Sequence, residues 1–419
     1  MSLDDPPKKF DYPKYLDWMQ QYNHNFFRLW AWELVKGIAE KEWWTASPHP
    51  WERTGEEKAN DGKPKFDLMR FNSEYFERLR TRVKMTQERG MYLSVMLFEG
   101  WGLQFFPKPW QYHPFNPGNN VNGVNGDLDG DGNGLEIYTL ADAKITSIQE
   151  EYVKKVIDTV NEFDNILYEI SNENHPPSTK WQYHMIDLIH EYEKSKQKQH
   201  PVGMTFQFQG GSNQTLFDSP AEWISPNPEG GYKDDPPAAE GKKVIINDTD
   251  HLWGIGGNQA WVWKTFTRGM YSIFMDLYDS FGRSKPDQQW DPIRKNLGYV
   301  RRLAERTNLI DMIPHNELSS TTYCLANPGK EYIVYLPLGG EVTVNLRDVS
   351  GSFSVEWFNP NTNESKMGEK IEGGEEQVLT SPFGGAGTVK RGIIYILSVF
   401  GVSETHFEST DAVLYLKSI

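Results

Sequence analysis

Two segments of the chain carry acidic side chains at positions where a buried strand would end. The apolar run at residues 166–170 leads into Asn172 and Glu173, and the run at residues 243–247 leads into Asp248. Short apolar runs bounded by turn residues are typical of strands buried on both faces, as in a parallel sheet. In α/β barrels the catalytic side chains follow the carboxyl ends of such strands. We therefore expect these acidic groups to meet at one mouth of a barrel.

A pair of carboxyl groups facing each other across a barrel mouth is the arrangement that cleaves a glycosidic bond. One carboxylic acid protonates the leaving oxygen, and the other attacks or stabilises the sugar cation. A lone glutamate after a strand is more often a surface group paired with a cation, because charged side chains are mostly exposed. The catalytic interpretation of Glu173 therefore depends on the rest of the chain.

The length and composition of the chain indicate a globular protein with more than one domain. A chain of 419 residues is too long for one ordinary core. Its net charge of −15 argues against nucleic acid and anionic membranes as partners. Aromatic residues make up 14%, and many of the 15 tryptophans fall in loops rich in glycine and proline, which suggests stacking surfaces. Cys324 is the single cysteine, so an internal disulfide and a cysteine metal cluster are excluded.

The first residues do not resemble a secretory leader. Residues 1–9 are charged and proline-rich, and no run of 18 apolar residues occurs in the chain, so we expect no membrane span. We expect a secreted or periplasmic protein if a leader was removed, and a cytoplasmic one otherwise.

Strands and helices alternate from about Tyr12 to residue 314. A helix is predicted at residues 12–22, and seven apolar strands follow between Phe26 and Met275, separated by amphipathic segments. This alternation predicts a (β/α)8 TIM barrel over residues 1–314 whose first strand is not evident. The apolar run at residues 393–397 could supply that strand, although a strand of a sandwich core would look the same.

Short β-rich runs separated by glycine, proline and asparagine turns occupy residues 315–419. Their length and number predict a small all-β sandwich as an accessory domain. Two long segments of the barrel, residues 34–70 and 99–140, are predicted to be loops. Long loops inside compact domains are usually functional, so we expect these two to shape the substrate cleft.

One part of the second loop resembles the first half of an EF-hand calcium loop. Alternate side chains would supply hard oxygen ligands, and Gly132 falls where the sharp turn is needed. Tyr138 occupies the usual position of the last acidic ligand, for which Glu136 could substitute. The alternative is a turn-rich loop whose aspartates bond to their own backbone. The candidate calcium ligands are Asp127, Asp129, Asp131, Asn133 and Glu136.

The ordered motifs resemble the large clan of retaining (β/α)8 glycoside hydrolases. They resemble most closely a bacterial branch in which the barrel precedes a small domain labelled collagen-binding. The matching segments are NFFRLWAWE at residues 25–33, FDNILYEISNE at 163–173, DTDHLWG at 248–254, YIVYLP at 332–337 and WFNP at 357–360. Asn-Glu alone is a weak motif, whereas the full ordered set is fairly specific for the fold.

The resemblance implies a glycosidase that acts on an oligo- or polysaccharide and needs no cofactor for catalysis. It implies that Glu173 is the acid/base, that Asn172 binds a sugar hydroxyl, and that Arg28 orients the nucleophile. The clan normally has glutamate as nucleophile after strand seven, whereas this chain offers Asp248 or Asp250. We favour Asp248, the first residue past the strand. If neither aspartate comes close enough to attack the sugar, a wider pair with water between the carboxyl groups would make the enzyme inverting. The alternative to an enzyme is a non-catalytic carbohydrate-binding barrel.

Further polar and aromatic residues lie near the predicted strand ends and are candidates for sugar binding. His251 could position the nucleophile or make a structural hydrogen bond, and exposed tryptophan faces could stack on sugar rings. Besides Arg28 and Asn172, the candidates are Trp30, Trp32, Glu33, Glu99, Trp101, His175, Gln207, His251, Trp253 and Asp276.

Overall fold

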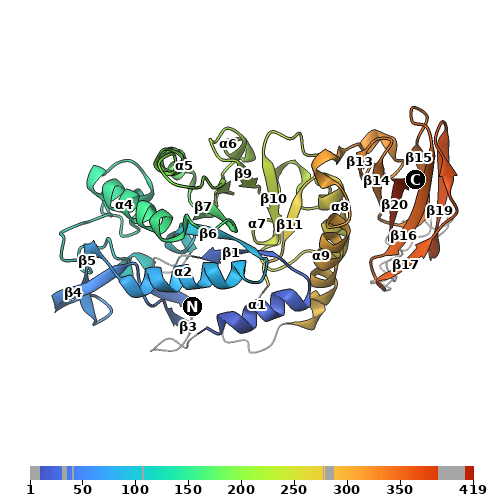
Figure 1. Ribbon diagram of the computed structural model, residues 1–419. Helices are drawn as coiled ribbons and strands as arrows, with labels where there is room; N and C mark the ends of the chain where they lie inside the picture. Colours follow the sequence, from blue (N-terminus) through green and yellow to red (C-terminus); the bar gives the residue numbers. More distant parts are fainter. Residues whose placement is uncertain are drawn as a thin grey trace, which may run out of the picture. The chain divides into compact units, whose positions relative to one another are not determined.

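The computed structural model describes residues 10–30, 35–39, 42–105, 108–276, 278, 287–385 and 411–419. The chain divides into two compact units (Figure 1). Unit 1 comprises Met1–Glu229, Lys242–Ile255 and Met275–Asp287, and unit 2 comprises Gly230–Gly241, Gly256–Phe274 and Gln288–Ile419. The predicted domain boundary between residues 314 and 315 stays a prediction.

A parallel sheet forms the centre of unit 1. Its strands are β1 (Phe26–Trp30), β6 (Tyr92–Glu99), β7 (Ile166–Asn172), β8 (Val202–Thr205), β9 (Trp223–Ser225) and β10 (Val244–Asp248), and they pair in this order. The last strand in the sheet order is β11 (Tyr271–Ile273), whose residues are assigned to unit 2. The predicted TIM-barrel class and its seven strands are therefore confirmed. Residues 393–397, which could supply a further strand, lie outside the described residues.

Helices cover the sheet of unit 1 where the sequence predicted them. The long helices are α1 (Tyr12–Gln21), α2 (Ser73–Gln87), α4 (Ala143–Val160) and α5 (Thr179–Glu193), and α2 and α5 pack against the strands β6 to β8 (Figure 1). Each of the first three begins at a side chain that accepts a backbone N–H bond, as preferred at helix starts. These caps are Asp11, Asn72 and Asp142. Short helices are α3 (Gly102–Phe105), α6 (Asn213–Phe217), α7 (Thr249–Trp253) and the 3₁₀ turns η1 (Pro109–Tyr112), η2 (Leu135–Tyr138), η3 (Pro176–Ser178) and η4 (Glu229–Gly231).

The segment predicted as a loop at residues 34–70 contains two antiparallel hairpins. One pairs β2 (Lys36–Ala39) with β3 (Glu42–Thr45), and the other pairs β4 (Trp51–Lys58) with β5 (Pro64–Phe71). The prediction of a loop was wrong here. Strand β4 is mostly polar and largely solvent-facing, so it lacks the alternation of apolar residues that identifies a strand in sequence.

Close packing inside the sheet makes Gly203 a sensitive position. A Cβ atom there would lie 1.9 Å from Cε2 of Trp223, whose indole N–H donates to the Tyr168 carbonyl at 3.1 Å. We expect Gly203→Ala to lower stability by about 1–3 kcal/mol, as overpacked cores do. Urea unfolding measures this, with Glu191→Ala, at a position of helix α5 whose side chain is 74% exposed, as the comparison. Equal losses in the two variants would contradict the packing argument.

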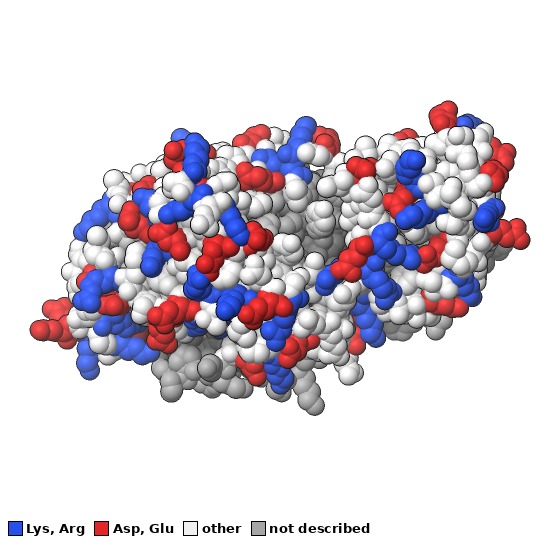
Figure 2. Space-filling model, viewed as in Figure 1, with Lys and Arg blue, Asp and Glu red and all other residues white. Residues whose placement is uncertain are grey.

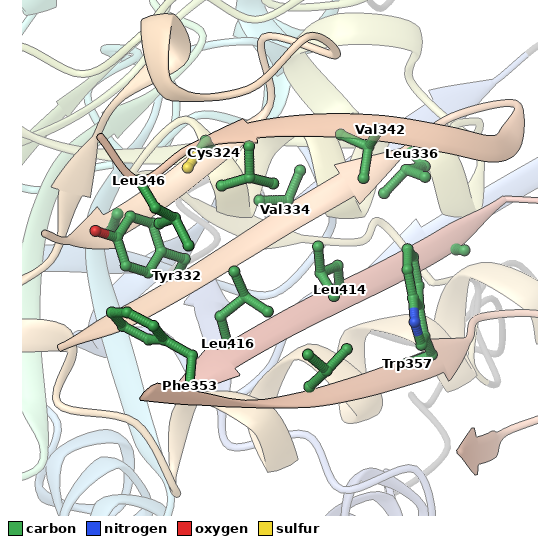
Figure 3. Packing of buried hydrophobic residues seen from close by; sticks show 14 residues of the cluster. Cys324, Tyr332, Val334, Leu336, Val342, Leu346, Phe353, Trp357, Leu414 and Leu416 are labelled. Atoms are coloured by element: carbon green, nitrogen blue, oxygen red, sulfur yellow. The ribbon is translucent and has the colours of Figure 1, made fainter. Parts of the chain in front are cut away.

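Unit 2 contains a β-sandwich, as predicted. One sheet has the order β12 (Ile313–Pro314), β13 (Cys324–Asn327), β14 (Glu331–Leu336), β20 (Ala412–Ser418), β16 (Ser352–Asn359) and β17 (Glu364–Met367), with β18 (Ile371–Glu372) beside β16. The other sheet pairs β15 (Gly339–Asn345) with β19 (Glu376–Gly385). Side chains from both sheets, including Tyr332 and Trp357 of the first and Val342 of the second, form one buried core (Figure 3). Cys324 is buried in it, and burial raises the pKa of its thiol to about 12.

Two helices belong to unit 2 with the sandwich. Helix α8 (Gln259–Thr267) and helix α9 (Asp291–Ala304) pack on the outer face of the sheet that contains β14. Trp263 stacks on Tyr335 with ring centres 6.3 Å apart, and Asn296 accepts the Trp263 indole N–H at 2.8 Å. Short 3₁₀ turns lie at η5 (Gln288–Trp290), η6 (Leu309–Asp311) and η7 (Asn316–Leu318).

The face of the molecule in Figure 2 shows acidic and basic side chains interspersed. Within the described part of the chain, no helix is long and apolar enough to span a membrane.

Candidate functional site

Arg28 on β1 connects an acidic group of β7 with two acidic groups at the end of β10 and the start of α7. Its guanidinium forms two bonds with Glu169 on β7, at 2.9 and 2.5 Å, and one of 3.0 Å with Asp248 on β10. Asp250 lies farther away, at 3.5 Å. Burial by itself would lower the pKa of Arg28, but the surrounding carboxylates raise it above its usual value, so the guanidinium stays charged.

Asp248 ends β10 and also begins helix α7. One oxygen accepts the Arg28 bond, and the other accepts the backbone N–H of Asp250 at 2.9 Å. Burial raises the pKa of Asp248 to about 7; Arg28 and the cap bond oppose this shift, while Asp250 and Glu169 support it. Both oxygens of Asp248 therefore already have protein partners.

Glu173 follows β7 directly and has an unusual backbone conformation. Its φ of 43° lies in the left-handed region that non-glycine residues seldom adopt, and such strain concentrates at functional sites. Gln104 holds this turn by donating to the carbonyls of Gly100 and Glu173, both at 2.9 Å. Burial raises the pKa of Glu173 well above its usual value, and Asp250, Asp248 and Glu99 raise it further, against the influence of Arg28. The carboxyl group therefore retains its proton to a higher pH than an ordinary glutamate.

The side chains of Glu173, Asp250 and His251 converge. One ligand atom from each lies within 4.8 Å of the other two. His251 contacts the Ser225 hydroxyl through Nδ1 at 2.7 Å, and its Nε2 is buried with no partner among the described residues. Burial, reinforced by Arg28, holds the pKa of His251 well below its usual value, so the imidazole is neutral. Burial also raises the pKa of Asp250, opposed by Arg28.

Several predicted binding residues lie at this end of the sheet. Asn172 accepts a bond from Arg28 at 2.6 Å, whereas its Nδ2 is buried and has no partner among the described residues. Both oxygens of Glu99 accept the backbone N–H of Gly102 at 2.8 Å. Trp101 stacks on Phe105, which is 56% exposed, with ring centres 4.4 Å apart.

His175 and Gln207, two further predicted binding residues, are hydrogen-bonded to neighbouring parts of the protein. His175 contacts the Leu135 carbonyl at 3.0 Å through Nε2, and Gln207 donates to the Thr179 hydroxyl at 3.0 Å. The Arg28 guanidinium lies 5.9 Å from the ring centre of Trp30. Trp253 ends α7, and the charge of Asp276 acts on the Tyr15 hydroxyl. Trp32 and Glu33 lie outside the described residues.

Sequence reasoning did not identify Glu169, Gln104 or Ser225 as part of this site. For Glu169 a signal existed, because a charged residue inside the apolar run at residues 166–170 must find a buried partner. For Gln104 and Ser225 the contacts depend on chain segments far apart in sequence, and no local pattern marks them.

The predicted calcium loop brings together three of its five candidate ligands. Oxygens of Asp127, Asp129 and Glu136 lie within 4.8 Å of one another. One oxygen each of Asp127 and Glu136 is buried without a partner among the described residues. Burial raises the pKa of Glu136, and the charges of Asp129 and Asp131 raise it further. Asp131 instead accepts bonds from the backbone and side chain of Asn133, both at 2.8 Å.

Calcium binding by this loop stays a prediction. Oxygen ligands of this kind suit Ca²⁺, and a ligand that binds only the folded state raises its stability. We expect millimolar Ca²⁺ to stabilise the chain by about 1 kcal/mol, or roughly 2–4 °C in the midpoint of thermal unfolding. Glu136→Gln should remove this shift, and Glu151→Gln, on the exposed side of α4, should retain it. A shift that persists in Glu136→Gln would rule out the predicted ligands.

Two family models match parts of the chain. One, described as "Domain of unknown function (DUF6298)", matches residues 28–209, and one described as "Putative collagen-binding domain of a collagenase" matches residues 310–391. No curated protein matches the chain.

Solved structures of glycoside hydrolases resemble the chain over almost its whole length. A glycoside hydrolase family 5 protein from Bacteroides vulgatus ATCC 8482 has a TM-score of 0.62 at 12% identity, covering 97% of this chain and 86% of its own. A protein described as a glycoside hydrolase has a TM-score of 0.58 at 11% identity, covering 97% and 88%. A second B. vulgatus protein, described as a putative glycoside hydrolase, has a TM-score of 0.57 at 12% identity, covering 96% and 75%. At such identities the likeness concerns the fold, and this chain has the fold of these glycoside hydrolases.

Proposed function

We propose that the protein is a retaining glycoside hydrolase that acts on an oligo- or polysaccharide. The observation that carries the proposal is the facing pair at the carboxyl ends of β7 and β10, where oxygens of Glu173 and Asp250 lie within 4.8 Å. Retaining enzymes have carboxyl groups about 5–5.5 Å apart, whereas inverting enzymes leave about 6.5–9.5 Å for a water molecule. The short separation favours retention.

Glu173 is the proposed acid/base. Its raised pKa favours the protonated form, which a group that must give a proton to the leaving oxygen requires. After the sugar has been transferred to the enzyme, the same group would take a proton from the attacking water. Its fixed backbone turn would hold the carboxyl group in place through both steps.

Asp250 is the proposed nucleophile, with Asp248 as the sequence-based alternative. Asp248 is occupied at both oxygens, as an ion-pair partner of Arg28 and as the cap of α7. The carboxylate of Asp250 is better placed to attack the sugar than that of Asp248. Its contact with Arg28 is longer, and it lies opposite Glu173. Arg28 would keep Asp250 ionised while Asp248 and Glu169 hold the guanidinium in position.

The surroundings of the pair suit a sugar ring. The unused N–H bonds of the buried Asn172 amide could donate to a sugar hydroxyl next to the reacting carbon. The half-exposed Phe105 and its stacked neighbour Trp101 present apolar ring faces near the end of β6. Such faces stack on the C–H groups of sugars.

The test is a hydrolysis assay on a panel of aryl glycosides and plant polysaccharides. We expect wild type to release sugar with retention of anomeric configuration, followed by NMR of the first product. Asp250→Asn should lose at least about 100-fold in kcat. Asp164→Asn, at a surface aspartate 75% exposed, should match wild type. Inverted product would overturn the retaining mechanism, and a larger loss in Asp248→Asn than in Asp250→Asn would reverse the assignment of the nucleophile.

If the folded wild-type protein binds a glycan in calorimetry but hydrolyses none of the panel, the proposed hydrolase activity is rejected. That result would support the alternative of a non-catalytic carbohydrate-binding barrel.

A further inference from the structure

We propose that Glu173, Asp250 and His251 form a binding site for a divalent transition-metal ion, with Zn²⁺ as the best-matched ion. Two carboxylates and one imidazole are donor groups that Zn²⁺ accepts. Their ligand atoms already lie within 4.8 Å of one another. Zinc ligands lie about 2.0–2.2 Å from the ion, so small side-chain rotations would close the site.

His251 has the arrangement expected of a metal ligand. The residue is 4% exposed, and Nε2 has no hydrogen-bond partner among the described residues. One nitrogen of the ring lies within 4.8 Å of a carboxyl oxygen of Glu173 and of Asp250. The other nitrogen, Nδ1, contacts the Ser225 hydroxyl at 2.7 Å. When Nδ1 donates this bond, Nε2 carries the lone pair. Metal-binding histidines are commonly fixed through their second nitrogen in this way.

The charge balance of the site also favours a cation. Five carboxyl groups act on this region, and Arg28 is the cation that compensates them among the described residues. Two of the five, Glu169 and Asp248, bind Arg28 directly, and Asp250 contacts it at the longer distance of 3.5 Å. Buried like charges repel one another strongly unless a proton or a metal ion compensates them. A divalent ion between Glu173 and Asp250 would supply two positive charges where compensation is weakest.

Metal binding by itself does not depend on the proposed function, but its consequence for turnover does. An ion bound to Glu173 would hold it as a carboxylate, so that it could no longer give a proton, and would also occupy the carboxylate of Asp250. Zn²⁺ should therefore inhibit hydrolysis reversibly, and a chelator should restore it.

The direct test is calorimetric titration of ZnCl₂ into the chelator-treated full-length protein, without any sugar. We expect one ion per chain at this site, with a dissociation constant in the micromolar range. His251→Asn keeps a group able to donate to Ser225 but removes Nε2, and should weaken binding at least about 100-fold, more than the loss of a supporting contact would. Glu173→Gln should act in the same way.

Two matched controls separate this site from other metal-binding groups. Asp129→Asn removes one carboxylate of the exposed loop cluster, and His184→Asn removes a partly exposed histidine paired with Glu150. Neither should change the affinity of this site. No binding by folded wild type would overturn the proposal, as would unchanged affinity in His251→Asn or an equal loss in Asp129→Asn.

A second measurement uses only the wild-type protein, so its result does not depend on whether a variant folds. Cu²⁺ binds nitrogen and oxygen sites more tightly than the other divalent ions of its series. Pulsed electron paramagnetic resonance of wild type with one equivalent of Cu²⁺ should show coupling to an imidazole nitrogen, and its absence would overturn the proposal. If Zn²⁺ binds but wild type hydrolyses no glycan, the metal site stands while the proposed function fails; hydrolysis without Zn²⁺ binding gives the reverse result.

Discussion

Glu173→Gln is expected to reduce turnover about 10²–10⁴-fold, the range for loss of a general acid/base. The amide keeps the volume of the side chain but has no proton to give to a leaving oxygen. The loss should be smallest for aryl glycosides with very acidic phenols, because such leaving groups need little protonation. Azide, which needs no general base, should restore part of the turnover of these substrates. A uniform loss across leaving groups, without rescue, would contradict the acid/base role.

The same substitution is expected to stabilise the folded chain at alkaline pH. In the native state the pKa of Glu173 lies above its unfolded value, so the folded state binds the proton more tightly. Stability therefore falls as pH rises from the unfolded pKa through the native pKa, because the buried charge must then be accommodated. Glutamine carries no charge and avoids this cost.

Thermal and urea unfolding between pH 4 and pH 9 measure this effect. We expect Glu173→Gln to exceed wild type by about 1–2 kcal/mol at the alkaline end, as substitutions that relieve a destabilised active site commonly do. The difference should disappear at the acidic end, where both side chains are neutral. Glu162→Gln, at a surface glutamate 49% exposed, serves as the control. A stability difference that grows toward acid pH would contradict the buried, raised-pKa carboxyl group.

Arg28→Met is expected to cost about 3–5 kcal/mol of stability and to abolish turnover. The side chain is 6% exposed, and its loss leaves Glu169, fully buried, without its charge partner. Removing one member of a buried ion pair has a cost of about this size because the other charge remains desolvated. Asp248 would lose its Arg28 bond at the same time, so its carboxylate would be less well positioned.

A double substitution separates charge from packing. In Arg28→Met/Glu169→Gln the uncompensated carboxylate is absent, so we expect part of the lost stability to return, with coupling of about 0.5–3 kcal/mol between the two sites. Arg89→Met breaks a surface pair with Asp17, which is 65% exposed, and should cost no more than about 1 kcal/mol. Additive losses at Arg28 and Glu169 would contradict the ion-pair argument.

Local patterns were sufficient to predict most of the regular elements. The apolar runs of the parallel sheet stand out because both faces are buried, and the helices α2 and α4 begin at side-chain caps that are visible in sequence. Helix α8 was not predicted from the sequence. Trp261, Val262 and Trp263 are consecutive buried residues, so they do not form the single apolar stripe that identifies an amphipathic helix. Strand β4 was not predicted either, because its mostly polar residues show almost no apolar pattern.

The sequence by itself determined that the acidic groups stand at strand ends, since the runs before Glu173 and Asp248 are recognisable without any tertiary information. Only the tertiary structure decided which groups meet. Arg28 and Glu169 are 141 residues apart and pair because β1, β6 and β7 are neighbours in the sheet. The approach of Glu173 to Asp250 and His251 likewise depends on the left-handed turn after β7 and the helical turn after β10. Side-chain direction at the end of a strand is set by such backbone angles and by contacts with distant segments, which a local pattern does not contain.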